Sequence, residues 1–219
     1  MKKVIVFGIE DLASLAHFYL KHDSEYEVVA FCLTKNYLSK DQVFEGLPVI
    51  DFEEVHVLYS PDDYVFFAPL SARGMNKFRE SIYNEIKVKG YELISYVSSK
   101  VSLFPGAKIG DNCFILEDNT IQPFTEIGNN VIMWSGNHIG HHSVIKDHVF
   151  FASHVVLSGH CVVEPYCFFG VNSTVMDGVC IAEGTLVGMG ASITQDTEAY
   201  GVYGGERAKK GFKPSTDIY

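Results

Sequence analysis

Histidine is the residue type in this chain best placed to do chemistry, because it is concentrated in one short stretch. Six of the nine histidines fall within 23 residues: His138, His141, His142, His148, His154 and His160. Imidazole titrates close to physiological pH, so it can take a proton from an amine or a hydroxyl nucleophile. Grouped histidines can also bind a metal ion. The stretch therefore favours acid–base catalysis or metal binding.

The element that must position these histidines is a six-residue repeat. A large apolar residue recurs at every sixth position without interruption. The positions are Ile109, Ile115, Ile121, Ile127, Met133, Ile139, Ile145, Phe151, Leu157, Val163, Phe169, Val175, Ile181, Val187 and Ile193. This period fits neither a helix face nor a series of hairpins. It is typical of a parallel β-helix, in which each repeat is one short strand and one turn.

Small, β-branched or polar residues occupy a second register, two positions before each of these anchors. Residues two apart in a strand face the same way, so both registers should point inward and the residues beside the anchor outward. Three repeats make one coil of 18 residues, and the fifteen repeats predict five coils, about 24 Å tall at ~4.8 Å per coil. Cys113, Cys161 and Cys167 lie in the inward register and should fill the core. The sequence has no CxxC pair of the kind that would indicate a zinc or redox site.

The segment before the repeat alternates between strand and helix patterns, which predicts a small parallel α/β domain. The expected strands are 3–7, 26–33, 64–68 and 91–97, and the expected helices are 11–22 and 71–88. Gly8 ends the first strand, a position at which nucleotide phosphates often bind. However, Ile9, Glu10 and Asp11 follow it in place of further glycines. Gly8 is therefore either a substrate contact or a structural turn.

The repeat resembles the left-handed β-helix of the hexapeptide-repeat acyltransferases. With the α/β segment before it, the chain is similar to bacterial sugar acetyltransferases such as the bacillosamine and perosamine N-acetyltransferases and the sialic acid O-acetyltransferases. The resemblance implies a Rossmann-like α/β domain at 1–97, an all-β left-handed parallel β-helix at 98–195, and a C-terminal cap and tail at 196–219. It also implies acetyl-CoA as acyl donor, no resident metal, and a homotrimer. The family's glycine-rich first turn is missing here.

The resemblance also implies the roles of individual residues. The run from Ile139 to Lys146 aligns with the family's catalytic segment and selects His141 as the general base, with the backbone N–H of Gly159 as oxyanion donor. Cofactor contacts are expected from Gly159, Val171, Gly188, Met189 and Gly190. Substrate contacts are expected from Gly8, Asn137, His138 and His142. The family often has a carboxylate after the base, where this chain has His142. The orienting group is then Asn137, Asp147 or a residue of a neighbouring chain.

Outward aromatic residues on the repeat indicate a further surface. Trp134 follows the anchor Met133 and so should point outward, where it either stacks on a sugar or packs at a subunit interface. Phe150 and Phe168 also lie beside anchors and suggest an oligomer surface.

Composition limits the partners. The chain has 219 residues, a formal net charge of −10 and no basic block, which argues against nucleic acid or an anionic membrane. It carries no signal-like start and no bilayer-spanning run, so we expect a soluble cytoplasmic protein.

The resemblance implies acetyl transfer to the amine of a nucleotide-linked amino-sugar in surface polysaccharide or glycan biosynthesis. A sugar hydroxyl is the alternative acceptor. Two other classes remain: a non-catalytic scaffold, and a metalloenzyme of the γ-carbonic anhydrase type. The latter holds zinc by three histidines across an interface, two of them five residues apart. No two of the six clustered histidines have that spacing.

Overall fold

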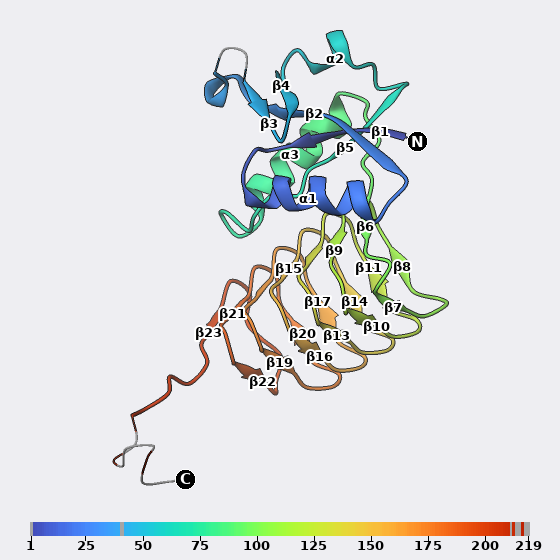
Figure 1. The fold of residues 1–219 in the computed structure, drawn as a ribbon. Helices are drawn as coiled ribbons and strands as arrows, with labels where there is room; N and C mark the ends of the chain where they lie inside the picture. The colour runs from blue at the N-terminus through green and yellow to red at the C-terminus, as the bar shows by residue number, and fades with distance from the viewer. Residues whose placement is uncertain (1, 40–41, 211, 213–215, 217–219) are drawn as a thin grey trace.

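The computed structural model describes residues 2–39, 42–210, 212 and 216, and it consists of an α/β domain seated on one side of a three-sided prism (Figure 1). The sheet of the α/β domain has the strand order β3-β4-β2-β1-β5. Its strands are β1 (Lys2–Phe7), β2 (Tyr26–Leu33), β3 (Val43–Phe44), β4 (Leu47–Asp51) and β5 (Tyr64–Phe67). All neighbouring strands are parallel except the hairpin pair β3 and β4. The predicted parallel α/β domain is therefore confirmed, with one antiparallel edge strand.

Two longer helices cover the two faces of this sheet. The helical elements are α1 (Asp11–His22), the 3-10 turn η1 (Lys35–Tyr37), α2 (Val55–Leu58) and α3 (Lys77–Val88). Val4 and Val6 share a buried cluster with α1, whereas Ile5 and Phe7 share one with α3. This alternation follows from the two-residue period of a strand.

Two predicted elements of this domain differ from the structure. The helix expected from Ser71 begins only at Lys77, because Gly74, Met75 and Asn76 all have positive φ angles that an α-helix cannot contain. The strand expected over 91–97 is reduced to a single bridge at Leu93 and the short strand β6 (Tyr96–Val97).

The prism has three parallel sheets of two-residue strands. The domain-facing sheet contains β6, β9 (Phe114–Ile115), β12 (Ile132–Met133), β15 (Phe150–Phe151), β18 (Phe168–Phe169), β21 (Leu186–Val187) and β23 (Val202–Tyr203). The second sheet contains β7 (Ser102–Leu103), β10 (Thr120–Ile121), β13 (His138–Ile139), β16 (Val156–Leu157), β19 (Thr174–Val175) and β22 (Ser192–Ile193). The third contains β8 (Lys108–Ile109), β11 (Glu126–Ile127), β14 (Val144–Ile145), β17 (Val162–Val163) and β20 (Cys180–Ile181).

The predicted coil is confirmed by the strand register. His138 pairs with Val156 and Ile139 pairs with Leu157, so equivalent positions are 18 residues apart. From Ile115 to Ile193 the anchors are buried in one continuous core, and the cysteines of the inward register are buried with them. The coils therefore stack as the six-residue period requires.

The outward phenylalanines were predicted to form an oligomer surface, and this prediction is wrong. Phe150 is buried and Phe168 is partly buried in the cluster that joins the prism to the α/β domain. These side chains are outward with respect to the prism, but α1 lies against the same sheet (Figure 1). Their apolar surface is thus covered within the chain.

A buried cation fastens the two parts together. Arg79 of α3 is fully buried and donates hydrogen bonds to the carbonyl oxygens of Leu70, Ser71, Asn130 and Val149. Burial lowers the pKa of its guanidinium to about 9. Two of these carbonyls belong to the prism, so a single side chain bridges the domain boundary.

The ends of the prism extend past the segment predicted for it. β6 pairs with β9 although it precedes residue 98, and β23 pairs with β21 although it lies in the segment predicted as a cap. The predicted tail also includes residues 211, 213–215 and 217–219, which lie outside the described residues. Within the described part of the chain, no helix is long and apolar enough to cross a membrane.

Candidate active site

Turns between the second and third sheets form one edge of the prism, which we call the histidine edge (residues 140–143 and 158–161). His142 and His160 occupy the same corner of successive coils, with φ angles of 58° and 56°. Their rings stack with centroids 5.0 Å apart and an interplanar angle of 15°. The two residues are 18 positions apart, so the six-residue period places them at equivalent positions of successive coils.

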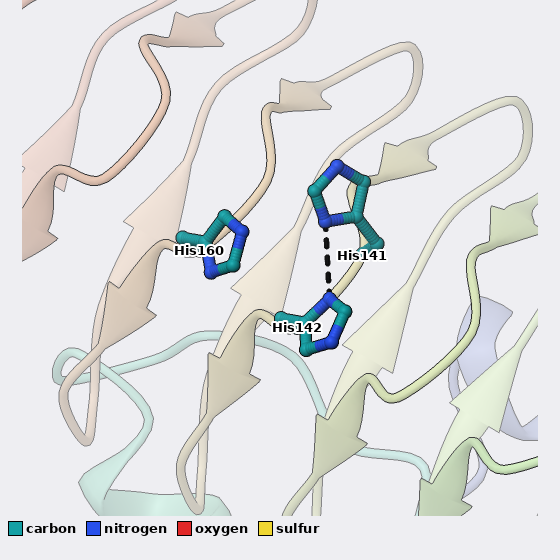
Figure 2. A group of neighbouring side chains, drawn as sticks. All are labelled: His141, His142 and His160. Atoms are coloured by element: carbon teal, nitrogen blue, oxygen red, sulfur yellow. Dashed lines mark hydrogen bonds between the residues drawn. The ribbon is translucent and has the colours of Figure 1, made fainter.

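His141 lies beside this stack and is exposed (Figure 2). Its Nδ1 atom is 3.2 Å from Nδ1 of His142, and its backbone N–H donates to Oε1 of Gln122. Only one of two facing ring nitrogens can hold the shared proton, so the contact ties the tautomer of one ring to that of the other. His142 thus occupies the place where the resemblance led us to expect a carboxylate.

Neither of the alternative orienting residues within the chain faces His141. Asn137 is fully buried, and its amide donates to the carbonyl of Trp134 and accepts from the N–H of Val155. Asp147 accepts from the backbone and side chain of Asn129. The predictions that Asn137 orients the base or contacts substrate are therefore wrong, because its hydrogen bonds hold the coils together from inside.

Gly159 lies directly against the His141 ring on the next coil. A Cβ atom at this glycine would lie 2.8 Å from Cε1 and 3.0 Å from Nε2 of His141, and 2.9 Å from Oδ1 of Asp177. Among the described residues, no hydrogen-bond acceptor is found for the N–H of Gly159. A glycine whose backbone donor has no acceptor among the described residues therefore lies beside an exposed imidazole.

Four of the five residues predicted to bind the cofactor lie on a different edge of the prism from Gly159. Val171, Gly188, Met189 and Gly190 belong to turns between the domain-facing sheet and the second sheet, which we call the glycine edge (residues 170–173 and 188–191). Met189 is 72% exposed, and a Cβ at Gly190 would meet nothing within 4 Å. Within one chain, the second sheet separates this open ledge from the histidine edge.

A cavity of about 580 Å³ opens in the α/β domain. It is lined by residues at the carboxyl ends of β1, β2 and β5 and by the start of α1, with Trp134 of the prism closing one side. The strand order reverses between β1 and β5, and ligands of open α/β sheets bind at such a point. Gly8 is buried in its wall with φ 112°, a conformation that favours glycine.

The charges around this cavity are mixed. Glu10 and Asp11 line it at the start of α1, and Arg73 lines it after β5. Sequence reasoning placed Gly8 and Trp134 in separate parts of the molecule and did not indicate Arg73 at all. The sequence does not show how the prism packs against the α/β domain, and this packing brings the outward Trp134 beside the end of β1.

The other histidines of the cluster are distributed over the prism. His138 is half-buried on the outer face of β13, and His154 is exposed in a turn leading from β15 to β16. His148 is buried at the remaining edge, where its Nδ1 contacts the side-chain amide of Asn130 at 2.9 Å. Burial lowers the pKa of His148, and the carboxylate of Glu80 partly offsets this effect. His148 is therefore a structural residue.

The repeat also matches a known family model. Residues 106–141 match the family described as bacterial transferase hexapeptide (six repeats). This match and the stacked coils define the second part of the chain as a hexapeptide-repeat β-helix.

Solved structures share the whole architecture. The acetyltransferase domain of PglB from Neisseria gonorrhoeae FA1090 has a TM-score of 0.82 and 19% identity, covering 95% of this chain and 99% of that one. A mutant of perosamine N-acetyltransferase from Caulobacter crescentus, in complex with CoA and GDP-perosamine, has a TM-score of 0.82 and 21% identity, covering 95% and 97%. WeeI from Acinetobacter baumannii AYE has a TM-score of 0.75 and 17% identity, covering 91% and 94%. These similarities confirm the predicted fold class.

Proposed function

We propose that this protein is an acyltransferase that moves an acetyl group from acetyl-CoA to the amine of a nucleotide-linked amino-sugar, in the synthesis of a surface polysaccharide or glycan. The observation that carries the proposal is the close approach of the His141 ring to Gly159, whose backbone N–H has no acceptor among the described residues. Acyl transfer needs a base for the proton of the nucleophile and a donor for the oxyanion, and this pair supplies both.

His141 acts as the base through Nε2. Its Nδ1–H donates to Nδ1 of His142 across the 3.2 Å contact, which leaves the lone pair of Nε2 free. As the sugar nitrogen attacks the thioester carbonyl, Nε2 takes the proton from that nitrogen. The Gly159 N–H donates to the developing oxyanion. When the carbon–sulfur bond breaks, His141 returns the proton to the departing thiolate of coenzyme A.

Acetyl-CoA supplies an activated acyl group, and the glycine edge fits its extended arm. Gly188 and Gly190 have no side chains that would block access to the turns. Val171 and Met189 offer exposed apolar surface beside them. The PglB domain, which has the same fold, was solved in complex with acetyl coenzyme A, and this supports acetyl-CoA as the acyl donor.

The nucleotide part of the acceptor binds in the cavity of the α/β domain. Gly8 allows close backbone approach at its wall, and Trp134 offers a ring face. His138, on the second sheet between the glycine and histidine edges, contacts the sugar. The perosamine enzyme of the same fold, bound to CoA and GDP-perosamine, supports this class of acceptor.

Within one chain, the second sheet keeps the glycine edge and the histidine edge apart. The cavity and the glycine edge lie on one side of the second sheet, and His141 lies on the other. We therefore propose a cytoplasmic homotrimer in which the glycine edge of one chain faces the histidine edge of the next. Cyclic symmetry then builds three equivalent sites.

Incubation with labelled acetyl-CoA and a panel of nucleotide-linked amino-sugars tests the activity, and His141→Ala should lower the rate by about 100- to 10,000-fold. An acetyl group on nitrogen resists hydroxylamine, whereas one on a hydroxyl is released, so the same product distinguishes the alternative acceptor. No transfer to any acceptor and no binding of coenzyme A would refute the proposal.

Mixing variants tests the placement between chains. His141→Ala removes the base that one chain gives to a site, and Trp134→Ala weakens sugar-nucleotide binding by the other chain, so activity is measured at a sugar-nucleotide concentration below KM. Mixed trimers of the two should regain activity at interfaces that pair an intact histidine edge with an intact cavity. Subunit exchange without any recovery would contradict a shared site.

A further inference from the structure

Three imidazoles converge on the histidine edge from two successive coils (Figure 2). One ring nitrogen from each of His141, His142 and His160 lies within 4.8 Å of the other two, and all three residues are exposed. The two Nδ1 atoms of His141 and His142 are 3.2 Å apart. Two nitrogen ligands of a tetrahedral zinc ion, with bonds of about 2.0–2.1 Å, are separated by about 3.4 Å. The pair already has nearly this spacing.

His160 is held close enough to act as the third ligand. Its ring centroid is 5.0 Å from those of both His141 and His142, and its backbone N–H donates to the carbonyl of His141. The backbone therefore fixes the three residues relative to one another, and side-chain rotation alone is needed to bring the nitrogens together. The open edge leaves a fourth position for water.

The chemistry of this group selects the ion. Imidazole nitrogen suits zinc, copper, cobalt and nickel, whereas calcium and magnesium require oxygen ligands. The three ligands are all histidine nitrogens. A divalent transition-metal ion is thus the class of ligand that fits.

We infer that His141, His142 and His160 bind a divalent transition-metal ion such as Zn²⁺, and that the bound ion inhibits acetyl transfer. The inhibition of acetyl transfer, unlike the metal binding, rests on the proposed function. An ion on Nδ1 of His141 displaces the proton shared with His142 and leaves Nε2 as an N–H group, which cannot accept a proton. An ion on Nε2 uses the lone pair directly. In both cases His141 is lost as a base.

Direct binding tests the site without reference to activity. Tag-free protein is titrated with Zn²⁺ by calorimetry and with Co²⁺ by visible absorption. We expect one equivalent per chain, and an affinity at least about tenfold lower in His142→Asn and in His160→Asn. Asparagine suits these positions, because Asn130 and Asn172 adopt the same left-handed backbone at other corners.

His154→Asn is the matched control. His154 is also an exposed corner histidine, with φ 60°, but it lies in a turn between β15 and β16, away from the cluster. It should bind both ions like the unaltered protein. The absence of saturable binding, or an equal loss of affinity in His154→Asn, would overturn the site.

The effect of Zn²⁺ on acetyl transfer distinguishes the metal site from the proposed function. Zn²⁺ should inhibit transfer by the unaltered protein at the concentrations at which it binds, and His160→Asn should need at least about tenfold more Zn²⁺ for the same inhibition. Saturating Zn²⁺ that leaves transfer unchanged would overturn the inhibition. Binding with the expected dependence on His142 and His160, in a protein that transfers no acetyl group, would leave the metal site standing and refute the proposed function alone.

Discussion

Gly159→Ala tests the His141–Gly159 pair with a single methyl group. That methyl carbon would lie 2.8 Å from Cε1 of His141. Carbon atoms without strain approach to about 3.5 Å, so the ring must retreat by about 0.7 Å. The backbone itself tolerates alanine, because Gly159 is not among the glycines with a left-handed φ angle. The substitution thus moves the base without changing its chemistry.

The expected loss follows from this displacement. A misplacement of about 1 Å can cost about 100-fold in rate, so we expect kcat to fall by about 10- to 100-fold. This range corresponds to about 1.4–2.7 kcal/mol in the activation free energy. The release of free coenzyme A thiol measures kcat, with thermal unfolding measured in parallel. Gly204→Ala is the control, since a Cβ there meets nothing within 4 Å and its φ angle is not left-handed.

A double substitution shows whether the methyl group of Gly159→Ala lowers kcat by displacing His141. If the methyl group acts by moving His141, then Gly159→Ala should add little further loss once His141→Ala is present. A full 10- to 100-fold additional loss would place the effect elsewhere in the site. A Gly159→Ala protein with unaltered kcat would refute the reasoning, because it would show that transfer does not depend on the position of the ring.

Other contacts predict effects of different kinds. Arg79→Met should lower the free energy of unfolding by about 3 kcal/mol, or the melting temperature by about 6–12 °C, because four backbone carbonyls each lose a hydrogen bond from Arg79. Denaturant titration measures the free energy of unfolding, and a change below about 1 kcal/mol would contradict the bridging role. Burial lowers the pKa of His148, so the unfolded chain takes up this proton first, and stability present above about pH 6.5 should be lost as pH falls. The loss measured from pH 7 to 5 should be smaller in His148→Asn, and equal pH dependence would exclude His148 as its source. Trp134→Ala should raise KM for the sugar nucleotide by about tenfold or more with a smaller effect on kcat, since Trp134 lines the cavity; an unchanged KM would place the nucleotide elsewhere.

The prism could be predicted almost completely from the sequence. A coil of 18 residues fixes which positions stack, so the adjacency of His142 to His160 and of His141 to Gly159 followed from spacing alone. The six-residue period also explains why the substrate contact predicted for Asn137 was wrong. This residue lies two positions before the anchor Ile139, in the register that points inward, where it cannot meet a substrate.

The parts that escaped prediction depend on how the two halves of the chain pack. The repeat treats its three faces alike, so nothing in its period shows that the face with Phe150 and Phe168 is covered by the α/β domain. The cavity beside Trp134 exists only because of that packing. The contact between His141 and His142 also depends on side-chain rotation, which residue spacing does not determine.

The left-handed corners of the prism show where the chain tolerates strain. Such corners suit glycine and asparagine, and a bulkier side chain costs about 1–2 kcal/mol there. At the remaining edge, His148 and Tyr166 occupy this conformation but pack against α3, with Tyr166 bonded to Glu80, so contacts within the chain compensate the cost. At the histidine edge, His142 and His160 adopt it while exposed, as does Phe124 on the preceding coil. Stacking of the rings offsets part of the strain, but the described chain leaves this column uncovered. Strain of this kind is found at functional sites, and the exposed histidine column agrees with the role that we propose for this edge.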